Sequence, residues 1–255
     1  MIDKTVIRKN FSRFAHLYDS YCSVQRLCAE RLISTIGNKD FKHILDVGCG
    51  TGNYTALLRK KFPLSNITAV DISQEMVKIA QNKLDKRNID FIISDAENFD
   101  FQGGFDLISS NVTLQWFQDL HSVLKKYKKL LNPQGVIQFS IFGPRTFYEL
   151  QESLESHFGK RAKINSNYFL NRENLEEVLK KLFNKIEVKE ASFQENYNSL
   201  SELLEKIRYT GVRGKGIDVN GGWTANKISS IEKIYKDKFG NVKANYQVFF
   251  AKGAK

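Results

Sequence analysis

Three acidic residues and one amide lie where predicted strands end, and together they suggest a binding site at one edge of a sheet. They are Asp46, Asp71, Asp95 and Asn111. Because open parallel sheets bind ligands along the edge formed by the carboxyl ends of their strands, we expect these side chains to lie close together. Carboxylates attract cations and accept hydrogen bonds, so the expected ligand carries positive charge and hydroxyl groups.

A glycine-rich turn lies beside the first of these acids. The apolar stretch 44–47 is followed by Gly48, Gly50 and Gly52, and then by helical apolar spacing. Strand, glycine turn and helix form the first unit of a doubly wound nucleotide-binding sheet, where glycine lets the backbone approach the ligand. A phosphate gains nothing from a carboxylate two residues before the turn, whereas an ammonium does. We therefore expect S-adenosylmethionine, with Asp46 near its ammonium and with Gly48 and Gly50 in contact with it.

The second acid lies where doubly wound sheets place a ribose-binding carboxylate. Asp71 follows the glycine turn by about 20 residues and ends the predicted second strand. Ser73 is expected to cap the next helix, whose start carries Ile72 and Met76 as further cofactor contacts. The remaining expected cofactor contacts are Asp95 and Ala96, at the adenine, and Asn111.

Hydrophobic periodicity predicts seven strands alternating with helices. The expected strands are 44–47, 66–71, 89–93, 105–111, 136–140, 185–193 and 244–251. Residues 130–135 are expected to be a helix end and a Pro/Gly turn before the fifth strand. Helices are expected within 5–36, after the first two strands, and at 146–154, 172–183, 199–208 and 224–239. This alternation predicts an α/β fold with a mostly parallel sheet.

The chain is expected to form a single domain, 1–255, with additions on both sides of the core. Residues 1–38 are predicted to form an N-terminal helical lid over the ligand edge. Residues 39–142 form the cofactor-binding core, and 143–255 supply cap helices and strands six and seven. The insert 197–241 is expected on the carboxyl side of the sheet as part of the cap.

Composition fits one soluble α/β domain, since 42% of the 255 residues are hydrophobic and 26% are charged. Cys22, Cys28 and Cys49 are an odd number without a C-x-x-C pair, which argues against a disulfide framework and against zinc, so no metal is expected. The start lacks the apolar segment of a signal peptide, and no apolar run is long enough to cross a membrane. We expect a cytoplasmic protein.

The net charge of +11 is the bulk property that concerns partners. A basic protein attracts polyanions such as nucleic acid, an anionic membrane or an acidic protein. A chain rich in Lys, Asn, Ile and Phe is also expected from a biased genome, so charge alone leaves the partner open.

Four motifs in order resemble the class I S-adenosylmethionine-dependent methyltransferases. They are L-D-V-G-C-G-T-G at 45–52, V-D-I-S at 70–73, D-A-E at 95–97 and L-N-P-Q-G at 131–135. The resemblance covers roughly residues 40 to 142 and implies a Rossmann-like class I methyltransferase fold. A dehydrogenase-type sheet shares the glycine turn but not the ordered set of motifs.

Segments spread over nearly the whole chain narrow the resemblance to the biotin-pathway malonyl-[acyl-carrier protein] O-methyltransferases. The similar segments are N-F-S-R-F-A-H-L-Y-D at 10–19, V-Q-R at 24–26, S-S-N-V-T-L-Q-W at 109–116, F-S-I-F-G-P-R-T-F-Y-E-L at 139–150, I-R-Y-T-G-V-R-G at 207–214 and Y-Q-V at 246–248. Arg145 departs from the small residue that is frequent in the family, and 157–170 matches only at Asn165. These departures concern the acyl-chain contacts.

The resemblance implies methyl transfer from S-adenosylmethionine to the free carboxylate of a malonyl thioester, leaving a methyl ester and S-adenosylhomocysteine. That carboxylate titrates near pH 4, so it is ionised at pH 7 and needs no general base. The protein must instead align it with the sulfonium methyl and replace its water. Tyr18 is the first candidate donor, and Gln115, Trp116 and Arg145 are the other candidate catalytic residues.

The implied partner is an acidic acyl-carrier protein that carries malonyl-phosphopantetheine, and the implied pathway is the early, pimeloyl stage of biotin synthesis. Basic residues around the segment 207–214 are candidates for docking it: Lys206, Arg208, Arg213 and Lys215. Attraction between a basic rim and an acidic partner chiefly raises the association rate.

Three other functions remain as alternatives. The first is a small-molecule O- or C-methyltransferase, acting on quinone precursors or aconitate-like acids, which shares the core and differs in the cap. The second is a nucleic-acid enzyme, but the chain lacks a zinc module and has S-N-V-T where a base-methylation loop would stand, so neither nucleic acid nor membrane is expected as a partner. The third is a scaffold without cofactor, which the intact glycines and Asp46 and Asp71 oppose.

Overall fold

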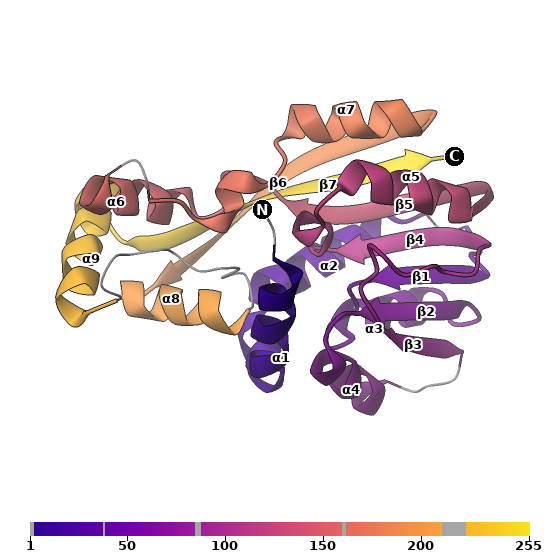
Figure 1. Cartoon of the computed structure of the whole chain (residues 1–255), viewed down its shortest axis with the longest axis horizontal. Coiled ribbons are helices and arrows are strands. Elements are labelled where there is room, and N and C mark those ends of the chain that lie inside the picture. Colours follow the sequence, from indigo (N-terminus) through magenta and orange to yellow (C-terminus); the bar gives the residue numbers. More distant parts are fainter. Residues whose placement is uncertain (1–2, 38, 85–87, 160–161, 211–222) are drawn as a thin grey trace.

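The computed structural model describes residues 3–37, 39–84, 88–159, 162–210 and 223–255. Seven strands in these residues form one sheet in the order β3-β2-β1-β4-β5-β7-β6 (Figure 1). The strands are β1 His43–Val47, β2 Asn66–Asp71, β3 Ile89–Ile93, β4 Phe105–Asn111, β5 Leu131–Phe142, β6 Lys185–Tyr197 and β7 Val242–Ala254. β7 runs antiparallel to both neighbours, and the other pairings are parallel. The predicted mostly parallel α/β sheet is confirmed.

Helices cover both faces of this sheet because its central strands alternate their buried side chains. One face, with Ile44 and Ile67, packs against α2 (Ser23–Thr35), α3 (Asn53–Lys61) and α4 (Gln74–Lys83). The other face, with Leu45 and Ile108, packs against α5 (Leu120–Leu130) and α7 (Arg172–Leu182). Alternating side chains in a buried parallel strand produce this three-layer arrangement.

Side-chain caps fix two helix starts that position the site. The Ser73 hydroxyl accepts a hydrogen bond from the Met76 amide at 3.2 Å and begins α4 directly after β2. Asn171 begins α7 in the same way, accepting from the Asn174 amide at 2.9 Å. Both caps were predictable because Ser and Asn satisfy the free amides of a first helical turn.

The start of β5 differs from the expected Pro/Gly turn. Leu131 pairs with Phe105, and the next pairs couple Val136 and its successors to β4, so residues 132–135 bulge out of a continuous strand. The Asn132 amide nitrogen donates to the Gly104 carbonyl at 3.1 Å, which ties the bulge to the preceding loop. This side-chain hydrogen bond holds residues 132–135 to the preceding loop where the pairing between β4 and β5 is interrupted.

The N-terminal segment forms two helices, α1 (Lys4–Tyr21) and α2, that meet at Cys22. α2 lies against the sheet, whereas α1 stands across the carboxyl ends of the strands (Figure 1). The Asp3 carboxylate caps α1 by accepting from the amides of Thr5 and Val6. Of the two helices, α1 therefore lies over the ligand edge as expected, whereas α2 belongs to the layer on one face of the sheet.

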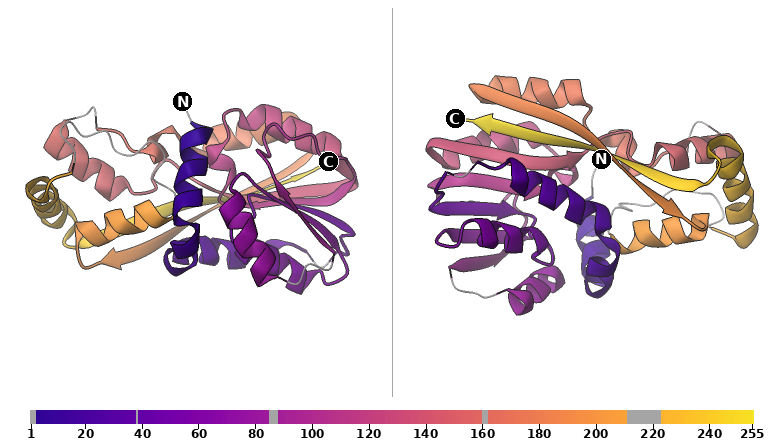
Figure 2. Two further views of the ribbon diagram at one scale, coloured as in Figure 1. Left: turned by 60° about the horizontal axis from the view of Figure 1, so that its bottom comes forward. Right: turned by 180° about the vertical axis from the view of Figure 1, so that it is seen from behind.

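The strands β6 and β7 continue past the sheet as a two-stranded ribbon. The last pairing between β5 and β7 joins Phe142 to Val248, while β7 residues 242–247 pair with β6. This extension leaves the sheet on its carboxyl side and carries α6 (Tyr148–Phe158), α8 (Leu200–Tyr209) and α9 (Ala225–Phe239) at its outer end (Figure 2). The described parts of the insert between β6 and β7 therefore lie on the expected side.

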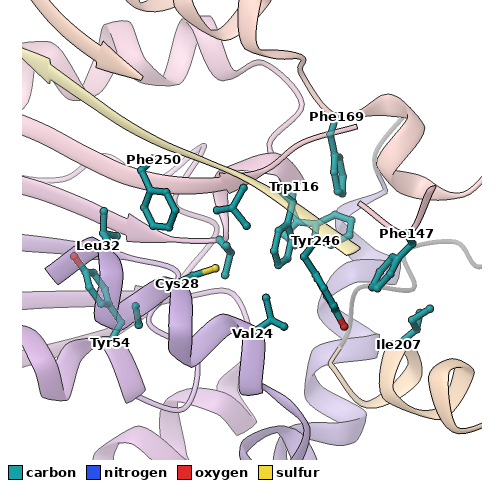
Figure 3. Packing of buried hydrophobic residues seen from close by; sticks show 14 of the residues in the cluster. Val24, Cys28, Leu32, Tyr54, Trp116, Phe147, Phe169, Ile207, Tyr246 and Phe250 are labelled. Carbon is teal, nitrogen blue, oxygen red and sulfur yellow. The ribbon is translucent and has the colours of Figure 1, made fainter. Parts of the chain in front are cut away.

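Aromatic side chains join this cap to the core. Trp116 packs edge-on against Phe169, with ring centroids 5.4 Å apart, and Phe147 packs against Tyr246 at 4.7 Å. These four rings and Ile207 belong to one buried cluster, which also contains side chains of α2 (Figure 3). A continuous apolar layer of this kind holds the cap against the sheet edge.

Candidate active site

A cleft lies at the carboxyl edge of the sheet, between the glycine turn and α1. Eight of the nine residues expected at the cofactor line it: Gly48, Gly50, Asp71, Ile72, Met76, Asp95, Ala96 and Asn111. The carboxyl ends of β1, β2 and β4 and the loop after β3 bring these residues together.

The glycine turn leaves no room for a side chain at Gly48. Gly48 has a positive φ of 76°, and a Cβ placed there would lie 2.2 Å from the Thr113 hydroxyl oxygen. Gly50, with φ of 53°, donates its amide to the Asp71 carboxylate at 3.0 Å. The turn therefore presents bare backbone to the cleft while holding the acid at the end of β2.

Two backbone donors orient Asp71. Besides the Gly50 amide, the Ser73 amide donates to its other oxygen at 2.8 Å. Burial raises the pKa of Asp71, and these backbone hydrogen bonds oppose that increase. A fixed carboxylate with free lone pairs on the cleft side is suited to accept hydrogen bonds from a diol.

Asp46 differs from the expectation, because it lies beneath the turn instead of on the cleft. It is fully buried, is absent from the lining, and accepts a 2.6 Å hydrogen bond from the Thr55 hydroxyl. Burial raises its pKa to about 7, although the Thr55 bond opposes this. Its other oxygen is buried and has no hydrogen-bond partner in the described residues.

α1 is fastened over the cleft at three points, which we call the α1 clasps. The Lys4 ammonium pairs with Asp95 at 2.5 Å and also with Glu97. The hydroxyls of Ser12 and Ser73 lie 3.0 Å apart.

The third clasp is formed by Asp19 at the end of α1. Its carboxylate accepts from the Thr51 hydroxyl at 2.6 Å and from the Asn53 amide at 2.9 Å, and pairs with Lys83 at 2.5 Å. Together the clasps tie one helix to the loop after β3, the start of α4 and the glycine turn. Each tie attaches α1 to a segment that lines the cleft.

Tyr18 and Trp116, both expected at the acceptor, line the cleft. Burial raises the pKa of Tyr18 well above its usual value, and the nearby Cys22 and Asp71 add to the effect. Its hydroxyl therefore stays protonated at neutral pH and is able to donate a hydrogen bond. Phe11 stands between the two rings, 6.3 Å from Tyr18 and 6.5 Å from Trp116, so they form one aromatic wall.

Two other expected acceptor contacts lie elsewhere. Gln115 is buried but absent from the cleft lining, and its amide donates to the Val112 carbonyl at 2.6 Å. Arg145 is exposed, and its guanidinium lies 5.4 Å from the Tyr148 ring. Of the short helical turn Leu114–Trp116, only the tryptophan lines the cleft. The sequence of a loop does not reveal which of its side chains face a site.

The two expected docking residues that the structure describes differ in their exposure to solvent. Lys206 is buried, contrary to expectation: it forms an ion pair with Glu195 and donates to the Ser23 hydroxyl. Arg208 is exposed on α8. Arg213 and Lys215 lie outside the described residues.

This chain is similar to known proteins in its family match, its sequence and its structure. A family model described as a methyltransferase domain matches residues 44–135. Malonyl-[acyl-carrier protein] O-methyltransferase 1 of Ilyobacter polytropus is 37% identical over 94% of this chain and 90% of its own length. The chain belongs to the malonyl-[acyl-carrier protein] O-methyltransferase family. A second relative, the malonyl-[acyl-carrier protein] O-methyltransferase of Acetivibrio thermocellus, is 34% identical over 98% of this methyltransferase and 93% of its own length.

Solved structures share the fold of this methyltransferase. The YcgJ protein of Bacillus subtilis matches with a TM-score of 0.62 and 15% identity, over 90% of this chain and 98% of its own. Phosphoethanolamine N-methyltransferase 2 of Haemonchus contortus, solved with S-adenosyl-L-methionine, matches with a TM-score of 0.60 and 20% identity, over 97% of this chain and 59% of its own. Both likenesses support the Rossmann-like methyltransferase fold.

Sequence reasoning missed several cleft residues on the N-terminal helices of this methyltransferase. Lys4, Ile7 and Phe11 line the cleft together with Tyr18, and Gln25 of α2 does so with an unpartnered, buried side-chain oxygen. The spacing 4, 7, 11 and 18 is that of one helical stripe, so extending the predicted helix by one residue would have included Lys4. The signal available for Gln25 was its place in the V-Q-R segment at 24–26, which resembles the family.

In the part of the chain that the structure describes, no helix is long and apolar enough to cross a bilayer. Across the same ranges, no cluster of three or more His, Cys, Asp or Glu side chains is placed to bind a metal ion. Cys22, Cys28 and Cys49 are all buried free thiols.

Proposed function

We propose that this methyltransferase transfers a methyl group from S-adenosylmethionine to the free carboxylate of malonyl-[acyl-carrier protein], early in biotin synthesis. The observation that carries the proposal is the 37% identity to a malonyl-[acyl-carrier protein] O-methyltransferase over 94% of this chain, which includes lid, core and cap. A core-only likeness would support methyl transfer without indicating the acceptor. We place the reaction in the cytoplasm, with an acidic carrier protein as partner.

The cleft fits the proposed cofactor on its own chemistry. A Cβ at Gly48 would clash with the Thr113 side chain, so only backbone faces the cleft there, and Asp71 presents an oriented carboxylate suited to ribose hydroxyls. Asp95 and Ala96 would border the adenine. The buried, unpartnered oxygen of Asp46 belongs to the strand that leads into the turn, and its ionised form would favour a positive charge nearby.

Bound S-adenosylmethionine would supply an electrophilic methyl group on a sulfonium. A malonyl carboxylate oxygen would form the new bond to that carbon as the carbon–sulfur bond breaks, so no proton is transferred. The protein's part is to orient the carboxylate and remove its water. Tyr18 donates from the lid and Trp116 supplies an apolar wall, and together they would hold the acceptor against the cofactor.

The proposal is tested with labelled S-adenosylmethionine and a set of acceptors: malonyl-carrier protein, malonyl-coenzyme A, free malonate, trans-aconitate, a quinone precursor and RNA. Base-labile label on the malonyl thioesters, and none on the other acceptors, is the expected result. The Asp71→Ala variant serves as the control with weakened cofactor binding, and its labelling of the malonyl thioesters should fall. Preferred labelling of free malonate, aconitate or the quinone precursor would indicate a small-molecule enzyme, and labelled RNA a nucleic-acid enzyme.

A further inference from the structure

The two faces of α1 have different properties. Ile7 and Phe11 face inward and line the cleft. Arg8, Lys9 and Arg13 are exposed, and we call them the α1 basic face. One helix therefore separates the cleft from solvent and presents positive charge on the outside.

No carboxylate in the described residues neutralises the α1 basic face. Elsewhere on the surface, cations are paired within their own helices: Arg172 with Glu176 at 2.8 Å on α7, and Lys236 with Glu232 at 2.5 Å on α9. The one acid within α1, Asp19, pairs with Lys83 of α4. The α1 basic face thus keeps its full charge available to a partner.

Other lysines that have no acidic partner in their own helix are stabilised by their position in the fold. Lys128 and Lys129 belong to the last turn of α5, and Lys60 and Lys61 to the last turn of α3, where cations are favoured by the carboxyl end of the helix. α5 runs directly into β5, so its last turn lies at the amino edge of the sheet, away from the cleft. Arg8 and Lys9 lie in the first half of α1, where the helix gives cations no such stabilisation.

We propose that the α1 basic face is the docking surface for the acidic carrier protein; this inference rests on the function proposed above. A carrier must approach within reach of its prosthetic arm, and α1 forms the outer wall of the cleft. Arg208 extends the surface, since its neighbour Tyr209 packs against Phe14 at 5.2 Å and Tyr21 at 4.7 Å, which holds α8 beside α1 (Figure 1). Arg208 is thus the α8 residue assigned to docking, because Lys206, which was also expected there, is buried.

Charge reversal tests the proposal with a matched control. The variant R8E/K9E/R13E removes the α1 basic face, and K125E/K128E/K129E makes the same change in net charge on α5. Each is assayed on malonyl-carrier protein and on malonyl-pantetheine, which has the same reacting group without the carrier. Because electrostatic steering changes association by about 10- to 1,000-fold, we expect kcat/KM on the carrier substrate to fall at least about tenfold in the α1 variant.

The α5 variant should match the wild type, and the α1 variant should retain cofactor affinity and activity on malonyl-pantetheine. Added salt should raise the wild-type KM for the carrier and have little effect on the α1 variant. Equal losses on both substrates, or equal losses in the two variants, would overturn the docking surface while leaving the reaction intact. Loss of binding to an RNA homopolymer or to anionic vesicles, with carrier kinetics unchanged, would assign the α1 basic face to that polyanion instead. A wild-type enzyme inactive on both malonyl substrates would overturn the proposed function and the docking surface together.

Discussion

Replacing Lys206 with methionine should weaken the fold and leave carrier recognition unchanged. The Lys206 ammonium pairs with the Glu195 carboxylate and donates to the Ser23 hydroxyl, which also donates to Glu195. The same carboxylate accepts from the Tyr197 hydroxyl at 2.7 Å and the Tyr246 hydroxyl at 3.2 Å. This buried network joins α2, α8 and the β6–β7 ribbon, so its loss should loosen the cap from the core.

The magnitude follows from burial and from what each change leaves unpaired. The Lys206 side chain is 9% exposed and that of Glu195 is 21% exposed, so both ions lie largely outside water. Breaking a buried pair costs about 3–5 kcal/mol. Lys206→Met leaves the Glu195 carboxylate with three hydroxyl donors and some contact with water, so the expected loss of unfolding free energy is about 2 kcal/mol. Glu195→Gln leaves the Lys206 ammonium unpaired and less hydrated, so the expected loss is about 3 kcal/mol. At 2–4 °C per kcal/mol, Tm should fall by about 4–12 °C.

Urea unfolding of both variants and of the double variant measures these costs. The double variant should lose less than the sum, because the second change removes a group already unpaired. Lys233→Met on the exposed side of α9 is the control and should be neutral. A Lys206→Met protein with wild-type stability but a raised KM for the carrier would refute the buried pair and restore Lys206 to the docking surface.

The same network predicts a dependence on pH. Burial alone would raise the pKa of Glu195, but hydrogen bonds from Lys206, Ser23 and Tyr197 outweigh it and hold the pKa below its usual range. A lowered carboxyl pKa contributes stability that is complete above its ordinary value and lost as the pH falls through the folded value. The difference in unfolding free energy between wild type and Glu195→Gln should therefore shrink in acid; a constant difference would contradict the shift.

Three further predictions concern the cleft. Asp71→Ala should weaken cofactor binding by about 1–3 kcal/mol in calorimetry, because hydroxyls lose their acceptor, and an unchanged affinity would remove Asp71 from the cofactor site. Tyr18→Phe should lower kcat on the malonyl substrate while leaving cofactor affinity intact, and a full kcat would make Tyr18 a packing residue. Gly48→Ala should abolish cofactor binding, since its Cβ would lie 2.2 Å from the Thr113 hydroxyl, whereas Gly37→Ala, with no atom within 4 Å, should bind normally.

The fold and much of the cofactor edge were predictable because their signals are local. An apolar run, a glycine turn and an acid at fixed spacing are read from neighbouring residues, and Asp71 was placed at its strand end on that basis. Asp46 shows the limit of this reasoning. Its position in the strand was predicted correctly, but its side chain turns toward Thr55 on α3 and away from the cleft, which spacing alone does not reveal.

Long-range partners explain the remaining errors. Lys206 was assigned to the docking surface because it adjoins the matching segment 207–214, yet it is surrounded by Glu195 of the preceding strand and by Ser23, which is 183 residues away in the chain. Lys4 went unnoticed because its partners, Asp95 and Glu97, belong to the loop after β3. Only the folded chain brings such groups together, so local patterns carry no signal for them.

The α1 clasps have a consequence for the order in which substrates bind. Since all three join α1 to segments that line the cleft, a cofactor that enters or leaves under α1 must first release them. A carrier held on the outer side of the same helix would keep it closed. Turnover would then follow a compulsory sequence, with S-adenosylmethionine binding before the carrier and S-adenosylhomocysteine leaving after it. S-adenosylhomocysteine would accordingly inhibit competitively with respect to S-adenosylmethionine and noncompetitively with respect to the carrier.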